Sequence, residues 1–120
     1  MKILLWLLGA VMLAWPALAG DLPWRLVSVD GAEVAYAATI DLSQDGRISG
    51  QAPCNRYFAD LTAELPEFKP GPMGATKMAC ADLAAEANYL ALLGQMELAE
   101  VVEAELVLSG AGHRLVFVQK

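Results

Sequence analysis

The side chains best suited to covalent chemistry are two cysteines and one histidine. Cys54 and Cys80 are 26 residues apart, and His113 is the single histidine. A Cys54 thiolate with His113 as its base would be a nucleophile, as in thiol enzymes. In an oxidising compartment the two cysteines would instead form a disulfide, worth about 3 kcal/mol for a loop of this size. We favour the disulfide on cysteine number and on the export argued below, with two free thiols as the alternative.

Acidic side chains offer a second kind of site. Asp82 and Glu86 lie one helical turn apart and could bind a cation, but such pairs are more often a solvated helix face. A further acidic cluster lacks the Asp-x-Asp-x-Asp-Gly pattern of a calcium loop and is interpreted as surface charge. We therefore predict no catalytic residue, no metal and no cofactor. The acidic cluster consists of Glu97, Glu100, Glu103 and Glu105.

The most notable polar residues directly follow Cys54. Asn55 and Arg56 are candidates for binding, although an asparagine here also suits a turn that its side chain caps. Several aromatic residues could line a ligand pocket. In so small a domain they more often form the core, because each buries a large apolar area. These residues are Trp24, Tyr57, Phe58 and Tyr89.

The first nineteen residues have the pattern of a cleavable signal peptide. Lys2 precedes an apolar run over 3–15, and Pro16 then leads into Ala17-Leu18-Ala19. A short positive region, an apolar region and an A-x-A site are typical of secretion signals. The run is short for a membrane span, and an uncleaved anchor is the alternative. Residue 20 is glycine, not the cysteine of a lipoprotein, so we predict no lipid anchor and one exported domain over 20–120.

The charge of the chain disfavours polyanionic partners. The formal net charge is −6 at pH 7, and removing Lys2 with the signal peptide makes the remainder one unit more negative. Nucleic acid and anionic membranes are bound through lysine and arginine, so neither is expected as a partner. The simplest interpretation of the acidity is solubility.

The elements that must position these side chains are mainly strands. Residues 24–29 favour a strand that ends at Asp30-Gly31, and residues 38–43 and 47–50 predict a hairpin around Asp45-Gly46. A bend at Pro53 leads into a strand through Tyr57 and Leu61, and 66–74 is a proline-rich loop.

A single helix and two closing strands complete the expected order. The helix spans about 81–93, with Leu83, Ala87 and Leu90 on one face and Gly94 as its C-terminal stop. Strands over 103–109 and 114–118 flank the Gly110-Ala111-Gly112 turn. Strands, one helix and strands again predict an antiparallel, mainly β (α+β) domain with the helix packed across it.

Six short segments, in this order, resemble the META-domain family, which includes HslJ-like heat-shock proteins. They are Trp24-Arg25-Leu26, the D-G-x-x-x-G hairpin over 45–50, Cys54-Asn55-Arg56-Tyr57, Thr76-Lys77-Met78-Ala79-Cys80, the helix with Glu86, Tyr89, Leu90 and Leu93, and the closing hairpin with Leu106, Leu108, Leu115 and Phe117. Two features depart from the family pattern: Pro53 replaces the more usual glycine before C-N, and the lipoprotein cysteine is absent.

The resemblance implies a small barrel-like domain with one helix, a periplasmic setting, and a link to heat shock and novobiocin resistance without enzyme activity. We expect a monomer that binds an envelope protein or supports envelope stress tolerance. The alternatives are a carrier with a small apolar ligand in the barrel mouth near Tyr57 and Tyr89, and a thiol enzyme at Cys54. The candidate binding or motif residues are Asn55, Arg56, Tyr57, Thr76 and Tyr89.

Overall fold

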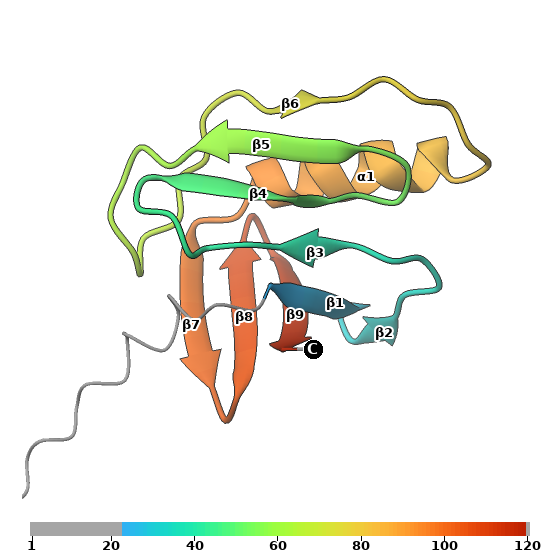
Figure 1. Ribbon diagram of the computed structural model, residues 1–120. Coiled ribbons are helices and arrows are strands. Elements are labelled where there is room, and N and C mark those ends of the chain that lie inside the picture. Colours follow the sequence, from blue (N-terminus) through green and yellow to red (C-terminus); the bar gives the residue numbers. More distant parts are fainter. Residues whose placement is uncertain (1–22, 120) are drawn as a thin grey trace, which may run out of the picture.

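The computed structural model describes residues 23–119, and the predicted signal peptide over 1–19 lies outside them. The described chain forms nine strands and one helix (Figure 1). No helix within 23–119 has the length and apolar character needed to cross a membrane. In chain order the elements are β1 (Trp24–Val29), β2 (Ala32–Glu33), β3 (Thr39–Ile40), β4 (Arg47–Gln51), β5 (Arg56–Asp60), β6 (Gly74–Ala75), α1 (Leu83–Gly94), β7 (Leu98–Val102), β8 (Glu105–Gly110) and β9 (His113–Gln119).

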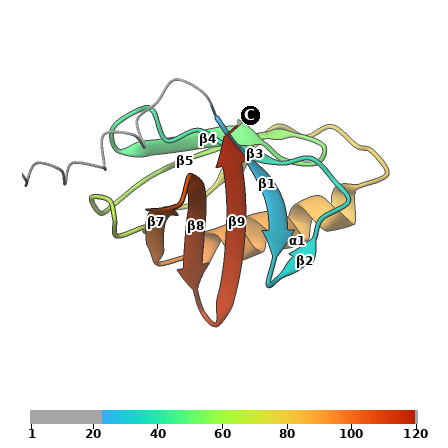
Figure 2. The ribbon, with the colours of Figure 1, turned by 90° about the horizontal axis from the view of Figure 1, so that it is seen from below.

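The larger sheet is antiparallel and joins the two ends of the domain. Its order is β2-β1-β9-β8-β7, with β3 also paired to β1 (Figure 2). Trp24 pairs with Gln119 and Val29 with Leu115, so the first strand lies beside the last. The strand predicted over 24–29 is confirmed with the same bounds. Closing the sheet with its N- and C-terminal strands explains why family-like residues occur along the whole chain.

The smaller sheet has the order β4-β5-β6 and lies against the larger one without merging into it. Single bridges link the two sheets at both seams: Asp41 pairs with Ser49, and Glu67 pairs with Leu98. The predicted hairpin over 38–50 is thus present, although β3 pairs mainly with β1. The domain is mainly β with one helix, as predicted, and its two sheets enclose the core like an incompletely closed barrel.

The helix buries a different face from the one predicted. Glu86, Tyr89 and Leu93 are its buried residues, whereas Leu83 is 43% exposed and Ala87 is also exposed. The prediction was wrong because it placed only apolar residues on the core face. The buried face instead contains a carboxylate and a tyrosine whose polar atoms have partners inside the domain. The helix also runs through Gly94 and is capped at Gln95.

One strand was not predicted. The acidic segment that we interpreted as surface charge includes β7, which pairs with β8 from Leu98–Ser109 to Val102–Glu105. Glu103 and Ala104 form the connecting turn with φ of 52° and 67°. Such turns normally use glycine, asparagine or aspartate. The strand was missed because the turn residues carry no turn signal.

Gly50 lies where two backbones approach closely, and replacing it gives a sharp test of the fold. A Cβ on Gly50 would overlap the Thr39 carbonyl and lie 2.8 Å from the Tyr57 hydroxyl oxygen. We expect Gly50→Ala to lower the free energy of unfolding by about 1–3 kcal/mol in urea denaturation, because the backbone must shift. Gly71→Ala is the matched control, since its Cβ would meet nothing nearer than 3.7 Å. Equal stability of the two variants would contradict this packing.

Candidate functional site

The two cysteines form the predicted disulfide at one end of α1. Cys54 and Cys80 are bonded with their Cα atoms 5.9 Å apart. The bond ties the loop before β5 to the segment that enters the helix, and Asp82 donates its backbone N–H to the Cys80 sulfur at 3.3 Å. Cys54 therefore has no free thiol to serve as a nucleophile. The thiol-enzyme alternative fails for this oxidised form.

Asn55 uses every hydrogen-bonding position of its side chain. Its Nδ2 donates to a Glu86 oxygen at 2.7 Å and to the Met78 carbonyl at 3.0 Å. Its Oδ1 accepts from the Thr76 hydroxyl at 2.9 Å and from the Met78 N–H at 2.6 Å. A side-chain amide offers two donors and two acceptor lone pairs, so this buried residue is fully satisfied. Asn55 is expected from sequence to cap a turn; it does more, because it joins the segment before β5 to α1 and to the segment after β6.

Glu86 is the buried anion of this network. Its Oε1 accepts the backbone N–H groups of Cys54 and Asn55, both at 2.7 Å, and its Oε2 accepts the Asn55 amide. The residue lies in the first turn of α1, where the helix dipole favours negative charge. The expectation that Glu86 is a solvated surface residue was wrong. The side chain is 6% exposed, and the carboxylate holds the Cys54-Asn55 loop to the helix.

The pKa of Glu86 reflects this environment. Burial acts to raise the pKa, but the Asn55 amide and the two backbone N–H groups outweigh it and hold the pKa of the carboxyl below its ordinary value of 4.5. A depressed pKa in the folded state means that the carboxylate stabilises the fold above the unfolded-state pKa. This contribution is lost as the pH falls through the folded-state pKa.

We therefore expect a specific pH dependence of stability. The difference in Tm between wild type and Glu86→Gln should be constant at neutral pH and should shrink as the pH falls below about 4.5. Thermal unfolding followed by circular dichroism between pH 7 and 3 measures it. Asp30, whose pKa is also lowered, is present in both proteins and cancels in the comparison. A Tm difference independent of pH would contradict a depressed pKa of Glu86.

The two tyrosines predicted to border a ligand cavity instead fill the core together. The hydroxyl oxygens of Tyr57 and Tyr89 are 2.9 Å apart, and Tyr57 donates to the Thr39 carbonyl at 2.6 Å. Their rings meet edge to face, and the side chains are 1% and 0% exposed. Burial raises the pKa of both phenols far above the usual value. No ligand space lies between the two rings, which removes the structural basis for a carrier with its ligand there.

Thr76 and Arg56 complete the motif at the sheet edge. The Thr76 hydroxyl accepts the Arg56 N–H at 3.2 Å while donating to Asn55, and the Thr76 N–H donates to the Arg56 carbonyl at 3.0 Å. The Arg56 side chain itself is exposed. Four of the five candidate residues thus have positioning contacts through their side chains, while the Arg56 guanidinium is left at the surface.

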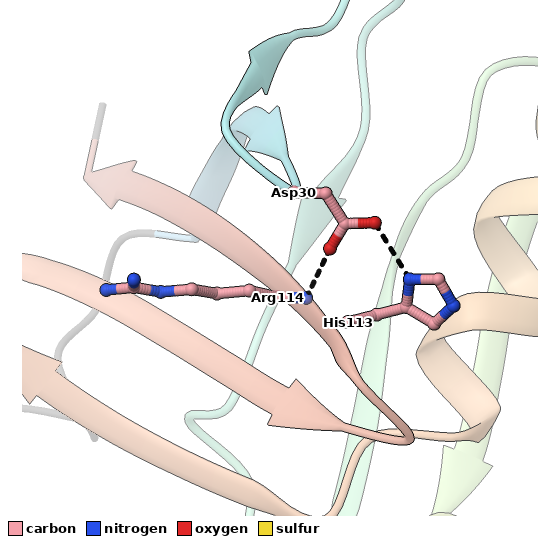
Figure 3. A network of polar contacts seen from close by, with 3 residues as sticks. All are labelled: Asp30, His113 and Arg114. Atoms are coloured by element: carbon pink, nitrogen blue, oxygen red, sulfur yellow. Dashed lines mark hydrogen bonds and ion pairs between the residues drawn. The ribbon is translucent and has the colours of Figure 1, made fainter.

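His113 lies away from Cys54. Its Nδ1 is 2.8 Å from a carboxylate oxygen of Asp30, whose other oxygen accepts the Arg114 N–H at 2.8 Å (Figure 3). This exposed contact holds the turn after β1 to the start of β9. The hydrogen bond from His113, and then that from Arg114, lower the pKa of Asp30. His113 therefore has a local structural role at the surface and cannot serve as a base for Cys54.

The hollows of the described surface lie elsewhere. One of about 650 Å³ is floored by Leu42, Leu61 and Leu65 between the β3–β4 and β5–β6 connections. None of the five candidate residues lines it. Within 23–119, no three His, Cys, Asp or Glu side chains converge as they would at a metal site.

Sequence reasoning missed two members of the polar network. Glu86 was assigned to solvent, and the Thr39 carbonyl, which accepts from Tyr57, was not considered. The resemblance contained the signal for Glu86, because the family helix pattern includes this glutamate. Its partner could not be inferred from the sequence, since Asn55 is 31 residues away.

Comparison with known proteins agrees with this architecture. The solved structures that are similar include an NMR structure of a protein from Burkholderia xenovorans, with a TM-score of 0.68 and 24% identity over 87% of this chain and 85% of the other. A second NMR structure has a TM-score of 0.63 and 21% identity, covering 81% and 87% of the two chains. No curated protein matches the sequence. The model of the META domain matches residues 17–120, and the chain belongs to the META domain family.

Proposed function

We propose that this protein is an exported, non-enzymatic META domain that binds a partner protein in the periplasm and supports envelope stress tolerance. The signal-like N-terminal sequence and the Cys54–Cys80 bond support export, because disulfides persist in oxidising compartments. The polar groups of Asn55 and Glu86 are engaged with each other and with the backbone. They form a scaffold, which directs attention to what the scaffold presents.

The observation that carries the proposal is the exposed segment from Thr76 to Cys80. Thr76 is held by Asn55 and Arg56, Met78 by two hydrogen bonds to Asn55, and Cys80 by the disulfide. The Met78 side chain is nevertheless 64% exposed. A large apolar side chain on a well-held loop is typical of an interaction site, since its backbone is already ordered before binding.

Photo-crosslinking in cells tests the proposal. A photoreactive amino acid at Met78 should give a discrete adduct in the periplasmic fraction, and the same group at Val102, which is 47% exposed on β7, is the control. Met78→Glu should abolish binding of the captured protein, whereas Val102→Glu should not. Identical adduct patterns at both positions would contradict a specific partner site.

The export and stress components have their own measurements. Intact mass of the purified periplasmic protein should correspond to a chain starting at residue 20 and lacking two hydrogens for the disulfide. Cells without the gene should survive heat shock less well, and wild type should restore survival while Met78→Glu should not. Full rescue by Met78→Glu would separate stress tolerance from this surface.

A further inference from the structure

The outer face of the β4-β5-β6 sheet carries exposed side chains in a regular arrangement. On β5, Tyr57 and Ala59 are buried whereas Arg56, Phe58 and Asp60 are exposed. Strand alternation places these three on the side opposite the core. The register sets Arg47 beside Asp60 on the neighbouring strand. The inner side of the sheet packs on α1 through the Tyr57–Tyr89 contact, so Arg56, Phe58 and Arg47 belong to a face directed away from the domain (Figure 1).

Phe58 is held in place at the centre of this face. Its ring lies against Gly74 of β6, where a Cβ would come within 2.8 Å of the ring Cζ. The Arg47 guanidinium carbon lies 5.7 Å from the ring centroid, within the range of a cation–π contact. The side chain is still 42% exposed. The result is a fixed aromatic platform at the surface.

The charge of this region is opposite to that of the protein. Lys and Arg are scarce in the chain, whose net charge is −6. Arg47 and Arg56 lie on the face, and Lys77 directly follows Thr76, which is paired with Arg56. Within residues 23–119 none of these three cations forms a salt bridge, and Asp60 is the acidic residue of the face. The three cations are therefore free to pair with an anionic partner.

The geometry also restricts the form of the partner. None of the three surface hollows is lined by Arg47, Arg56 or Phe58. The face offers a flat strand surface, suited to an extended chain. Arg47 pairs with Asp60 and Gln51 with Arg56, so the two arginines lie four residues apart along the sheet, about 13 Å at the usual rise per residue. Phe58 lies between them.

From this juxtaposition we infer that the outer sheet face binds an extended acidic peptide segment, with carboxylates four residues apart and an apolar side chain midway between them. The carboxylates pair with Arg47 and Arg56, and the apolar side chain covers Phe58. This inference rests on the proposed partner-binding function and assigns the chemistry of the partner. Electrostatic complementarity of this kind determines partner choice and association rate more than total affinity.

Fluorescence polarisation with a defined probe tests the inference. The probe is a labelled peptide of two Glu-Ser-Leu-Ser-Glu repeats, measured at low ionic strength against the full mature protein. We expect binding that weakens with added salt and that falls at least about tenfold when Arg47→Glu and Arg56→Glu are combined. The matched control combines Arg25→Glu and Arg114→Glu, which make the same charge change on β1 and β9 and should bind more than the Arg47/Arg56 variant.

Further arms keep the outcome decisive. Phe58→Ala should weaken binding, and a peptide with lysine in place of glutamate should not bind. Arg47→Gln with Arg56→Gln replaces the charge-reversed variant if circular dichroism shows that the latter is unfolded. Equal loss in the two double variants, or equal binding of phosphatidylglycerol vesicles or of an oligothymidylate, would overturn the inference. A partner crosslinked at Met78 whose binding survives loss of Arg47 and Arg56 would leave the proposed function standing and refute only this inference.

Discussion

Replacing Glu86 with alanine should lower the free energy of unfolding by about 3–5 kcal/mol, measured by urea denaturation at pH 7. The change strands three buried or partly buried donors: the N–H groups of Cys54 and Asn55 and the Asn55 side-chain amide. Each loses a bond to a charged acceptor and no solvent-exposed group replaces it. Because most small domains are stable by only 5–15 kcal/mol, this variant should be close to unfolding at elevated temperature.

Two variants separate the charge from the packing. Glu86→Gln keeps one carbonyl oxygen, so we expect a smaller loss of about 1–3 kcal/mol. Glu100→Gln changes the same group on exposed β7 and should alter stability by no more than about 0.5 kcal/mol. If Glu86→Ala and Glu100→Gln had similar midpoints and slopes, the carboxylate network would not be a source of stability.

Removing the disulfide should have an effect of similar size. We expect the double substitution Cys54→Ser and Cys80→Ser to lower the free energy of unfolding by about 3 kcal/mol, because closing a loop of 26 residues restricts the unfolded chain. Urea denaturation of this variant and of reduced wild type should give the same midpoint. A midpoint equal to that of oxidised wild type would show that the bond adds nothing to equilibrium stability.

The two effects should not be additive. The Cys54 N–H that binds Glu86 belongs to a disulfide-bonded residue, so each change loosens the loop that the other constrains. A double-mutant cycle with Glu86→Gln and the two serine substitutions should therefore show a coupling energy above the roughly 0.5 kcal/mol typical of independent sites. Combining Glu100→Gln with the serine substitutions supplies the additive reference.

The polar network and the proposed binding surfaces depend on each other. Asn55 fixes Met78 by two backbone contacts and meets Thr76, whose hydroxyl reaches the start of β5. The same internal contacts thus order the Met78 segment and the Arg56 end of the outer sheet face. A stable interior beneath exposed apolar and cationic side chains lowers the entropy lost when a partner binds.

Much of the fold follows from local patterns. Residues 24–29 favour a strand through β-prone side chains, Asp45-Gly46 specifies a hairpin turn, and the count of cysteines in an exported chain indicates the bond between Cys54 and Cys80. These features depend on residues close in sequence or on composition, so they survive without knowledge of the packing. The ordered C-N-x-Y and T-x-M-A-C segments were also sufficient to suggest the family that the comparison shows.

The remainder was decided by tertiary contacts. Sequence periodicity placed Leu83 and Ala87 on the helix core face, but burying Tyr89 against Tyr57 and Glu86 against Asn55 turned that face outward. Strand β7 formed because pairing with β8 outweighed the weak local signal of a turn made by Glu103 and Ala104. The sequence by itself determined the strands with clear turn signals and the cysteine pair. Only the folded chain could determine that Glu86 is buried, because the donors that compensate its charge come from a loop 31 and 32 residues away.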